Sequence, residues 1–388
     1  MALVKLKDVV MRVKDKVDRD TADLDFYIGG EHFDYAEICI SRRGVIQGST
    51  IGPAFHMRFQ PGDVLLMSRN PHLRKAGVVD FEGICSDVSY VCRTKDENVL
   101  LQRYLPFIFQ TDHFWDFAES NKKGSTNFFL NWSDFEKYEF NLPPIEIQRE
   151  LTELLWAAEN TKLAYIDLLR QTDELVKSQF IEMFGSPESV MDSAHTIDEV
   201  ADVQVGIVIK PTRFYADGNN GIKAFRSLNI GPMCIKDDDW VYFTEDAMKE
   251  TQRTIAHTDD ILVVRSGNPG TSCVVPPEYD GCNVIDLIIA HPNKEKVLPA
   301  YLSAFTNMPH GMNQINSQQR GVAQKHFNVG MYKDLKLILP SLDKQKQFVD
   351  FLKQSDKSKF VCSNRNLSRC LVILQRTHTV IQLRNLQV

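Results

Sequence analysis

One stretch constrains this chain more than any other: residues 142–185, which read LPPIEIQRELTELLWAAENTKLAYIDLLRQTDELVKSQFIEMFG. Proline lacks a backbone N–H and fixes φ, so it fits the first turn of a helix but not its interior. No Gly or Pro follows Pro144 until Gly185, and Pro187 comes soon after. This spacing predicts one helix, about 60 Å long at a rise of ~1.5 Å per residue. A single globular domain rarely needs so long a helix.

Self-comparison of the chain indicates an internal repeat. When the sequence is shifted by 197 positions, several separate segments align at that one offset, while the sequence between them differs strongly. The aligned segments are Asp63-Val64-Leu65-Leu66 with Asp260-Ile261-Leu262-Val263, Tyr104-Leu105 with Tyr301-Leu302, Gly124 with Gly321, Leu142-Pro143 with Leu339-Pro340, and Gln148 with Gln345. A duplication that kept its frame and changed its surface explains this pattern.

Each half has the same order of parts. A variable region with strand–turn segments such as GDVLLMSRNP and DDILVVRSGNPG comes first, and a Leu-Pro stop and a long helix follow. We therefore predict an α+β chain with two mixed α/β modules that have β-rich cores, at 1–142 and 186–339. Two long helices, within 143–185 and 340–388, follow them, and the second helix is expected to run from about residue 341 to 380.

The two helices are expected to pair as an antiparallel coiled coil. Apolar or small residues recur along the first helix at spacings near three and four, from Ile147 to Met183, and a weaker seam runs from Phe348 to Leu374. Residues 143–190 carry a net charge of −5, and residues 340–388 carry +6. Opposite charges favour association and set orientation, although both sets could instead be solvated faces turned elsewhere. Antiparallel pairing would relate the modules by a pseudo-two-fold axis, a geometry that suits two half-sites on duplex DNA.

Composition describes a soluble globular protein. Of the 388 residues, 43% are apolar and 25% are charged, and no apolar run approaches the ~20 residues that span a bilayer. The charged N-terminus lacks a signal-peptide core, so we expect a cytoplasmic protein without membrane contact. The eight cysteines form no CxxC pair, so reduced thiols are expected rather than a zinc site. The net charge of −6 argues against non-specific coating of nucleic acid.

The sequence offers no convincing catalytic motif. It contains no GxxxxGK[ST] phosphate loop, no GxGxxG fingerprint and no HExxH zinc motif. Asn70-Pro71-His72 and Asn268-Pro269-Gly270 match only part of the Asn-Pro-Pro-aromatic signature of amine methyltransferases, and they read better as turns. We therefore expect a binding protein with no catalytic residue, metal site or cofactor of its own.

Polar loops suited to duplex DNA are present in both halves. Arg and Lys bind phosphates and guanine edges, whereas Asn and Gln bind adenine. Two groups occupy matching places in the repeat: the turn after GDVLL or DDILV, and the loop around Gly124 or Gly321. Any single member could be a solvated surface residue, and Asn127, Asn229 and Asn268 could bond their own backbones. The candidates are Arg42, Arg43, Arg69, Arg74, Lys75, Lys122, Lys123 and Asn127 in the first half, and Arg226, Asn229, Arg265, Asn268, Gln319, Arg320, Gln324 and Lys325 in the second.

At this point the chain resembles a known family, the specificity (S) subunits of type I restriction–modification systems. The resemblance lies in a module ending in LPPIEIQ with a helix ending in FIEMFG, followed by a module ending in LILPSLDKQ with a second helix. GDVLLMSRNP and DDILVVRSGNPGTSCVV resemble the strand–turn–strand of its target-recognition domains. The resemblance covers essentially the whole chain, in the order of parts that the family has.

The resemblance implies a non-catalytic subunit that determines which DNA sequence the complex recognises. Each recognition domain would read one half of a bipartite target in double-stranded DNA, and the paired helices would set the spacer. The helices would also dock DNA methyltransferase (modification) subunits, which carry S-adenosylmethionine, and a motor-nuclease (restriction) subunit would complete the complex. Three alternatives remain: a solitary or silent specificity protein of the same fold, a stand-alone nucleic-acid-modifying enzyme, and a scaffold for protein ligands.

Overall fold

The computed structural model describes residues 2–18, 23–208, 211–218, 220–319 and 327–362. These residues form two compact units that divide between Ile166 and Asp167. The helix α5, Ile145–Phe184, contributes its first part to unit 1 and its last part to unit 2. We describe each unit by itself.

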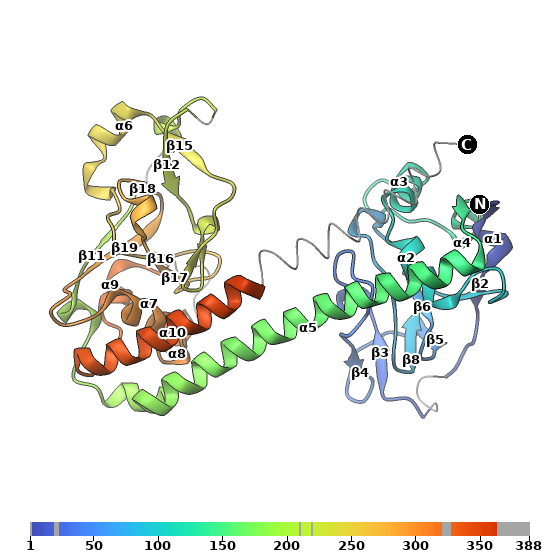
Figure 1. Ribbon diagram of the computed structural model, residues 1–388, viewed down its shortest axis with the longest axis horizontal. Coiled ribbons are helices and arrows are strands. Elements are labelled where there is room, and N and C mark those ends of the chain that lie inside the picture. Colours follow the sequence, from blue (N-terminus) through green and yellow to red (C-terminus); the bar gives the residue numbers. More distant parts are fainter. Residues whose placement is uncertain (1, 19–22, 209–210, 219, 320–326, 363–388) are drawn as a thin grey trace. The chain divides into compact units, whose positions relative to one another are not determined.

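Unit 1 consists of short strands and short helices ahead of α5 (Figure 1). Its strands are β1 (Ala2–Lys5), β2 (Val10–Val13), β3 (Phe26–Ile28), β4 (Gly44–Val45), β5 (Phe55–Phe59), β6 (Val64–Met67), β7 (Ala76–Val78), β8 (Gly83–Ser86), β9 (Ser89–Thr94) and β10 (Glu139–Leu142). Its helices are α1 (Leu6–Val9), α2 (Leu105–Phe109), α3 (Asp112–Ser120) and α4 (Trp132–Phe135). The strands form sheets in the orders β2-β9-β6-β7, β4-β3-β8-β5 and β1-β10.

Unit 2 has a similar set of elements. Its strands are β11 (Ala201–Val205), β12 (Ile222–Phe225), β13 (Ile230–Gly231), β14 (Cys234–Ile235), β15 (Val241–Phe243), β16 (Ile261–Val264), β17 (Ser272–Val274), β18 (Asn283–Val284) and β19 (Leu287–Pro292). Its helices are α6 (Glu245–Glu250), α7 (Pro299–Asn307), α8 (Pro309–Gln319), α9 (Val329–Lys333) and α10 (Leu342–Cys362). The sheet orders are β11-β19-β16-β17, β15-β12-β18 and β13-β14.

The main sheets of the two units share one topology. The order β2-β9-β6-β7 in unit 1 has the same antiparallel connectivity as β11-β19-β16-β17 in unit 2. In each unit a smaller sheet contains one parallel pair, β3 with β8 and β12 with β18. The predicted mixed α/β architecture is therefore present in both halves of the chain.

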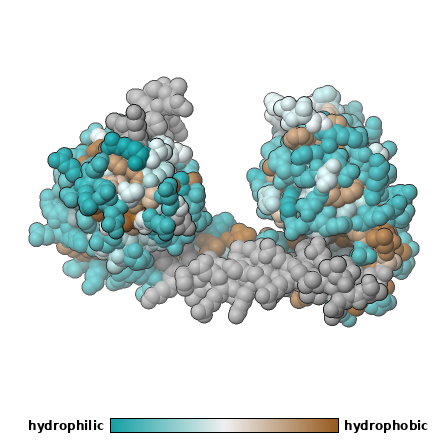
Figure 2. All heavy atoms as spheres, turned by 90° about the horizontal axis from the view of Figure 1, so that it is seen from above, coloured by the Kyte–Doolittle hydropathy of each residue, from teal (hydrophilic) through white to brown (hydrophobic). Residues whose placement is uncertain are grey.

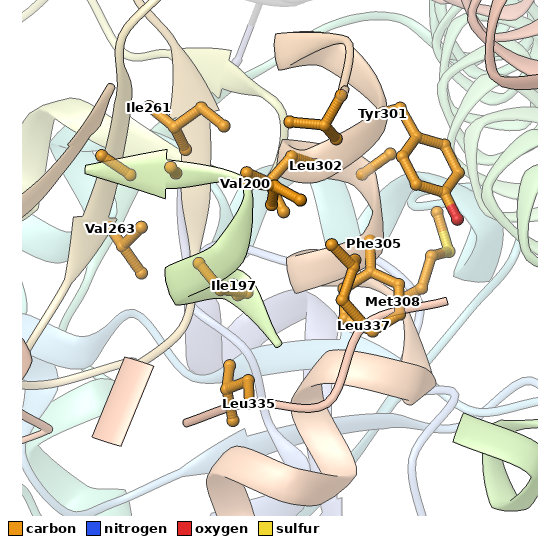
Figure 3. Close-up of a cluster of buried hydrophobic side chains, with 14 of the residues drawn as sticks. Ile197, Val200, Ile261, Val263, Tyr301, Leu302, Phe305, Met308, Leu335 and Leu337 are labelled. Carbon is orange, nitrogen blue, oxygen red and sulfur yellow. The ribbon is translucent and has the colours of Figure 1, made fainter. Parts of the chain in front are cut away.

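Strands β6 and β16 lie at the centre of these sheets. Every side chain of VLLM in β6 and of ILVV in β16 is buried, because both faces of the sheet are covered. In unit 2, helix α7 covers one face, and Tyr301, Leu302 and Phe305 pack in one cluster with Ile261 and Val263 of β16 (Figure 3). The two strand–turn segments that the sequence singled out are thus the core strands of their units.

Helix α5 begins and ends where the sequence signals predict. It starts directly after Pro144, and Gly185 follows its last residue with φ of +89°. The N–H of Gly185 donates to the carbonyl of Ile181 at 2.8 Å. A left-handed residue after the last turn is a common helix ending, and glycine adopts it without steric cost.

The expected seam along α5 is only partly buried. Val176, Phe180 and Phe184 lie in the core of unit 2. However, Leu168 and Leu175 keep 45% and 54% of their surface exposed. Ile147 and Leu154, which we also assigned to the seam, are exposed as well. These side chains lie on a face of α5 that no described residue covers. Much of the second helix that is expected to pair with this face lies outside the described residues, so the seam stays a prediction.

Helix α10 runs back along the last turns of α5 within unit 2 (Figure 1). The Phe348 ring meets the Phe180 ring edge-on at a centroid distance of 5.0 Å, and it meets Phe184 at 5.7 Å. The expected continuation of the second helix beyond Cys362 lies outside the described residues. Coiled-coil pairing along the whole length of both helices therefore stays a prediction.

Two buried glutamines at the start of the long helices make the same hydrogen bonds. In unit 1, Gln148 accepts from the N–H of Leu101 at 3.1 Å and donates to the carbonyls of Val99 and Pro143 at 2.8 Å. In unit 2, Gln345 makes the equivalent three bonds, and each partner lies 197 residues further along the chain. Both side chains are fully buried. Each glutamine ties the start of its helix to the chain just before an earlier helical segment, residues 102–109 in unit 1 and α7 in unit 2.

Replacing Gln345 by Ala should destabilise unit 2 by about 1–3 kcal/mol, because three buried backbone groups lose their partner. The partners are the N–H of Leu298 and the carbonyls of Lys296 and Pro340. Urea denaturation measures this loss. The exposed neighbour Gln347 supplies the control, since its truncation should leave the free energy of unfolding unchanged. Equal stability of the two variants would contradict the assigned role.

A buried aspartate directly precedes each central strand. Asp63 and Asp260 both accept a hydrogen bond from the backbone N–H three residues earlier, at 2.8 and 2.7 Å. Their charged partners differ between the units. Arg93 binds Asp63 with two nitrogens, whereas Nδ1 of His291 lies 2.6 Å from Oδ1 of Asp260. The hydrogen bond to Asp260 raises the pKa of His291.

Unit 2 should therefore lose stability as the solution becomes alkaline. A raised folded-state pKa contributes stability that is fully present below the unfolded value of about 6.5 and is lost as pH rises through the folded value. Replacing His291 by Gln should remove this component, which chemical denaturation at about pH 6 and about pH 9 would measure. The Arg93–Asp63 pair should show no such change, because arginine stays charged. An identical pH dependence in wild type and His291→Gln would contradict the prediction.

Candidate nucleic-acid interface

The two predicted loop groups of unit 1 lie side by side. The chain after β6 runs through Ser68, Arg69 and Asn70, and residues 128–130 pass next to it. The N–H of Asn70 donates to the carbonyl of Phe128 at 2.8 Å, and the N–H of Leu130 donates to that of Ser68 at 3.0 Å. The sequence places these groups some sixty residues apart, and tertiary hydrogen bonds join them.

The second of these loops is a tight hairpin. Lys123 and Phe129 exchange both backbone hydrogen bonds, at 2.8 and 3.0 Å. Gly124 has φ of +93°, and a Cβ there would lie 2.8 Å from the carbonyl oxygen of Asn127. The position therefore requires glycine. The hairpin leaves Asn127 exposed at its tip, with Lys123 exposed at its base.

Most predicted cations of unit 1 already have an acidic or carbonyl partner. Four of them form ion pairs, and Lys75 donates to the carbonyl of Gly30 at 2.6 Å. The ion pairs join Arg42 to Asp34, Arg74 to Asp112, Lys122 to Glu119 and Lys123 to Asp134. Arg43 and Arg69 instead lie over aromatic rings, Arg43 4.0 Å from the Phe26 centroid and Arg69 5.3 Å from that of Phe129. Among the predicted arginines of unit 1, Arg43 and Arg69 are the two whose charge is not neutralised by a described acidic side chain.

The side chain of Asn229 forms hydrogen bonds to the backbone around its own turn. Its side chain is fully buried, accepts from the N–H of Arg226 at 2.9 Å and donates to the carbonyl of Asp238 at 2.8 Å. Arg226 pairs with Asp239 at 3.2 Å. The local backbone role that the sequence left open for Asn229 is the one observed, and its amide is not placed to read a base. The exposed side chain of this turn is Leu228, at 58%.

Arg265 is also held internally. Its side chain is 14% exposed and forms an ion pair with Asp286. Its Nε donates to the carbonyl of Phe327 at 3.2 Å, and the N–H of Phe327 donates back to the carbonyl of Arg265 at 3.2 Å. Asn268 is exposed in the turn that follows. The rest of the second loop group is not described: Arg320, Gln324 and Lys325 lie outside the described residues, and of Gln319, the last residue of α8, only the backbone is described.

Unit 2 repeats the arrangement of unit 1. The bond from Phe327 to Arg265 corresponds, at a shift of 197, to the bond from Leu130 to Ser68. In both units, therefore, a backbone hydrogen bond joins the turn after the central strand to a segment 62 residues further along the chain. The loop around Gly321 lies outside the described residues, so the match of the two loop groups stays a prediction.

A single edge of unit 2 also gathers Arg226 and Arg265. The N–H of Ile285 donates to the carbonyl of Phe225 at 2.9 Å, which places the Arg226 turn beside Asp286, the partner of Arg265. The N–H of Asp286 in turn bonds the carbonyl of Ile207 at 3.0 Å, and Val208 follows with 50% exposure. Val208 and Leu228 are thus exposed apolar residues at this edge, and no signal in the sequence indicated their exposure.

The face shown in Figure 2 is mostly hydrophilic in both units, with scattered hydrophobic patches. Among the described residues, no group of His, Cys, Asp and Glu is placed to hold a metal ion. The described part of the chain also has no helix that is long and apolar enough to cross a membrane.

Comparison with known proteins shows what this chain is similar to. Residues 196–367 match the family model of the type I restriction modification DNA specificity domain. This match confirms the resemblance to type I specificity subunits over residues 196–367. No curated protein matches the chain.

Two solved structures show that the resemblance extends to the whole fold. The S subunit of a type I restriction-modification system from M. genitalium has a TM-score of 0.58 at 12% identity, covering 98% of this chain and 95% of that one. A chain from a structure on complex assembly and conformational transition of the type I R-M system has a TM-score of 0.52 at 17% identity, covering 98% and 96%. At these identities the likeness establishes the fold.

Proposed function

We propose that this chain is the DNA-recognition subunit of a type I restriction–modification complex and that each unit reads one half of a bipartite target. The observation that carries the proposal is the repeated frame. The same sheet order, the same glutamine hydrogen bonds and the same loop-to-turn bond recur at a shift of 197 residues. Two copies of one module that differ in their loops suit two half-sites that differ in sequence.

The long helices would set the distance between the half-sites. Helix α5 enters both units without a break, and the bound glutamines fix where each helix begins. A rigid helix transmits its length to whatever its ends hold, at ~1.5 Å per residue. The spacer between the half-sites would therefore follow from the number of residues in the helix.

The exposed face of α5 offers a place for protein partners. Leu168 and Leu175 lie seven residues apart and keep about half of their surface exposed. Exposed leucines at heptad spacing are typical of a helix face that another protein covers. We assign this face to the DNA methyltransferase subunits. Their S-adenosylmethionine would supply the methyl group, a motor-nuclease subunit would add cleavage, and the complex would act in the cytoplasm.

Footprinting of the full chain with its modification subunits, on random duplexes, tests the proposal. Two short protected blocks separated by an unprotected spacer are expected. A chain that protects DNA without any sequence preference would contradict it. Sequence-specific protection without methylation in the presence of S-adenosylmethionine would identify a silent specificity protein, and methylation by the chain alone would identify a stand-alone enzyme.

A further inference from the structure

Arg12 of unit 1 has an unusual environment. It lies on β2, paired in register with Cys92 of β9. Its guanidinium carbon sits 4.3 Å from the centroid of the Tyr90 ring. Its Nη2 donates to the carbonyl of Asp87 at 3.3 Å, near the long limit for such a bond. Sequence analysis did not select this residue, because a single arginine in an apolar strand gives no signal.

The charge and the donors of Arg12 are largely unused. Its Nε is buried and has no hydrogen-bond partner. No carboxylate of the described residues forms an ion pair with it. Arginine carries five N–H donors, and buried donors are nearly always paired in folded proteins. The arrangement is therefore incomplete and suits an anion that accepts from a guanidinium.

The fold itself does not require an arginine at this place. In unit 2 the corresponding position of β11 is Val203, which pairs with Ala290 of β19 and is 6% exposed. An apolar side chain thus completes the same sheet in the second copy. The arginine of unit 1 is an addition to the shared frame, and such additions are where the two modules can differ in binding.

Arg12 lies at the candidate interface. The carbonyl of Asp87 that it binds precedes Val88, whose carbonyl accepts from the N–H of Ser68 at 2.8 Å. Ser68 is followed by Arg69, the other arginine here that stacks on an aromatic ring. The side chains of Arg12 and Arg69, neither of which has a described acidic partner, are therefore both attached next to the turn that follows β6.

We propose that Arg12 binds a backbone phosphate of the DNA and that Tyr90 holds its guanidinium in place for this contact. The proposal rests on the proposed function and adds to it a residue outside the predicted loops. Phosphate oxygens can accept two N–H bonds from a guanidinium. Neutralising a phosphate releases counterions from the DNA, and this adds to the affinity without reading the sequence. Arg12 is in this sense a contact that positions the DNA.

Replacing Arg12 by Gln tests the proposal through salt dependence. Binding of the full chain to a random-sequence duplex is measured over a series of KCl concentrations. Loss of one phosphate contact should reduce the slope of log K against log [KCl] by about 0.9. Arg12→Lys keeps the charge and should restore most of the slope. The control is Arg58→Gln on β5 of the same unit, because Arg58 pairs with Glu82 at 3.1 Å and should leave the slope unchanged.

A second measurement uses the unaltered protein, so it does not depend on how the variants fold. Phenylglyoxal modifies accessible arginines, and mass spectrometry locates the modified residues. Duplex DNA should protect Arg12 and should leave Arg58 as reactive as before. An unprotected Arg12, or an unchanged slope in a folded Arg12→Gln variant, would overturn the proposal. A changed preference at one half-site with an unchanged slope would also overturn it, since that result assigns Arg12 to a base edge.

These outcomes separate the inference from the proposed function. If wild type binds duplex DNA with sequence preference and Arg12→Gln keeps the full slope, the phosphate contact alone is wrong. If wild type binds no duplex DNA, the proposed function itself fails.

Discussion

A four-residue insertion between Ile166 and Asp167 should lengthen the recognised spacer by about two base pairs and leave both half-site sequences unchanged. Four helical residues add about 6 Å, and B-DNA rises ~3.4 Å per base pair. Recognition of the two half-site sequences would be unaffected, because the insertion lies outside the candidate DNA-binding loops of both units. Methylation mapping on a random duplex library would measure spacer and half-sites together.

The place of the insertion matters. A point near Glu159 would be less suitable, because this residue is 1% exposed and its carboxylate pairs with Lys162 at 2.7 Å. An insertion there would disturb the packing of unit 1. Ile166 and Asp167 are exposed, and the two units divide between them. A seven-residue insertion at the same point should add about three base pairs, so the response should be graded. A changed half-site sequence with an unchanged spacer would contradict the proposal that the length of α5 sets the spacer.

Truncation of Phe180 to Ala should destabilise unit 2 by roughly 3–5 kcal/mol, the usual cost of removing a buried aromatic side chain. Phe180 is fully buried and lies at the meeting point of α5, α7 and α10. Its ring stacks on Tyr301 at a centroid distance of 5.8 Å and meets Phe348 at 5.0 Å. It also contacts His310, at 4.8 Å. The cavity would remove contacts from three helices at once.

Hydrogen exchange measured by mass spectrometry would locate this effect. Peptides from β16 and β19 should lose protection, while peptides from β6 and β9 in unit 1 should exchange as in wild type. Leu175→Ala is the matched control, because Leu175 lies on the same helix and is 54% exposed. It should change the free energy of unfolding by less than about 1 kcal/mol. Equal losses in both units would mean that α5 couples their stabilities, contrary to the prediction.

Local chemistry made part of this fold predictable. Pro144 and Gly185 predicted both ends of α5. Proline fits the start of a helix but not its interior, and Gly185 ends the helix with a positive φ. The 197-residue shift also pointed to Gln148 and Gln345, which then proved to make identical bonds. Such anchors are visible in sequence because a fixed frame allows few side chains at these positions.

The availability of the candidate binding residues was not predictable. Asn229 and Arg265 fit the pattern of DNA-reading residues, yet one is buried in its own turn and the other is paired with Asp286. Conversely, Arg12 belongs to no sequence motif, yet it lies over the Tyr90 ring and no described carboxylate neutralises its charge. Whether a polar side chain is free depends on neighbours that folding brings from distant positions, and a linear pattern does not contain them.

The sequence by itself thus determined the doubled order of parts, the bounds of α5 and the family resemblance, since each depends on local rules of backbone geometry or on a repeated frame. Tertiary structure alone decided which loops meet and which charges are neutralised. It placed Phe128 beside Asn70, Asp286 beside Arg265 and Tyr90 beneath Arg12. The physical reason is that hydrogen bonds and ion pairs form between groups that are close in space, whatever their separation along the chain.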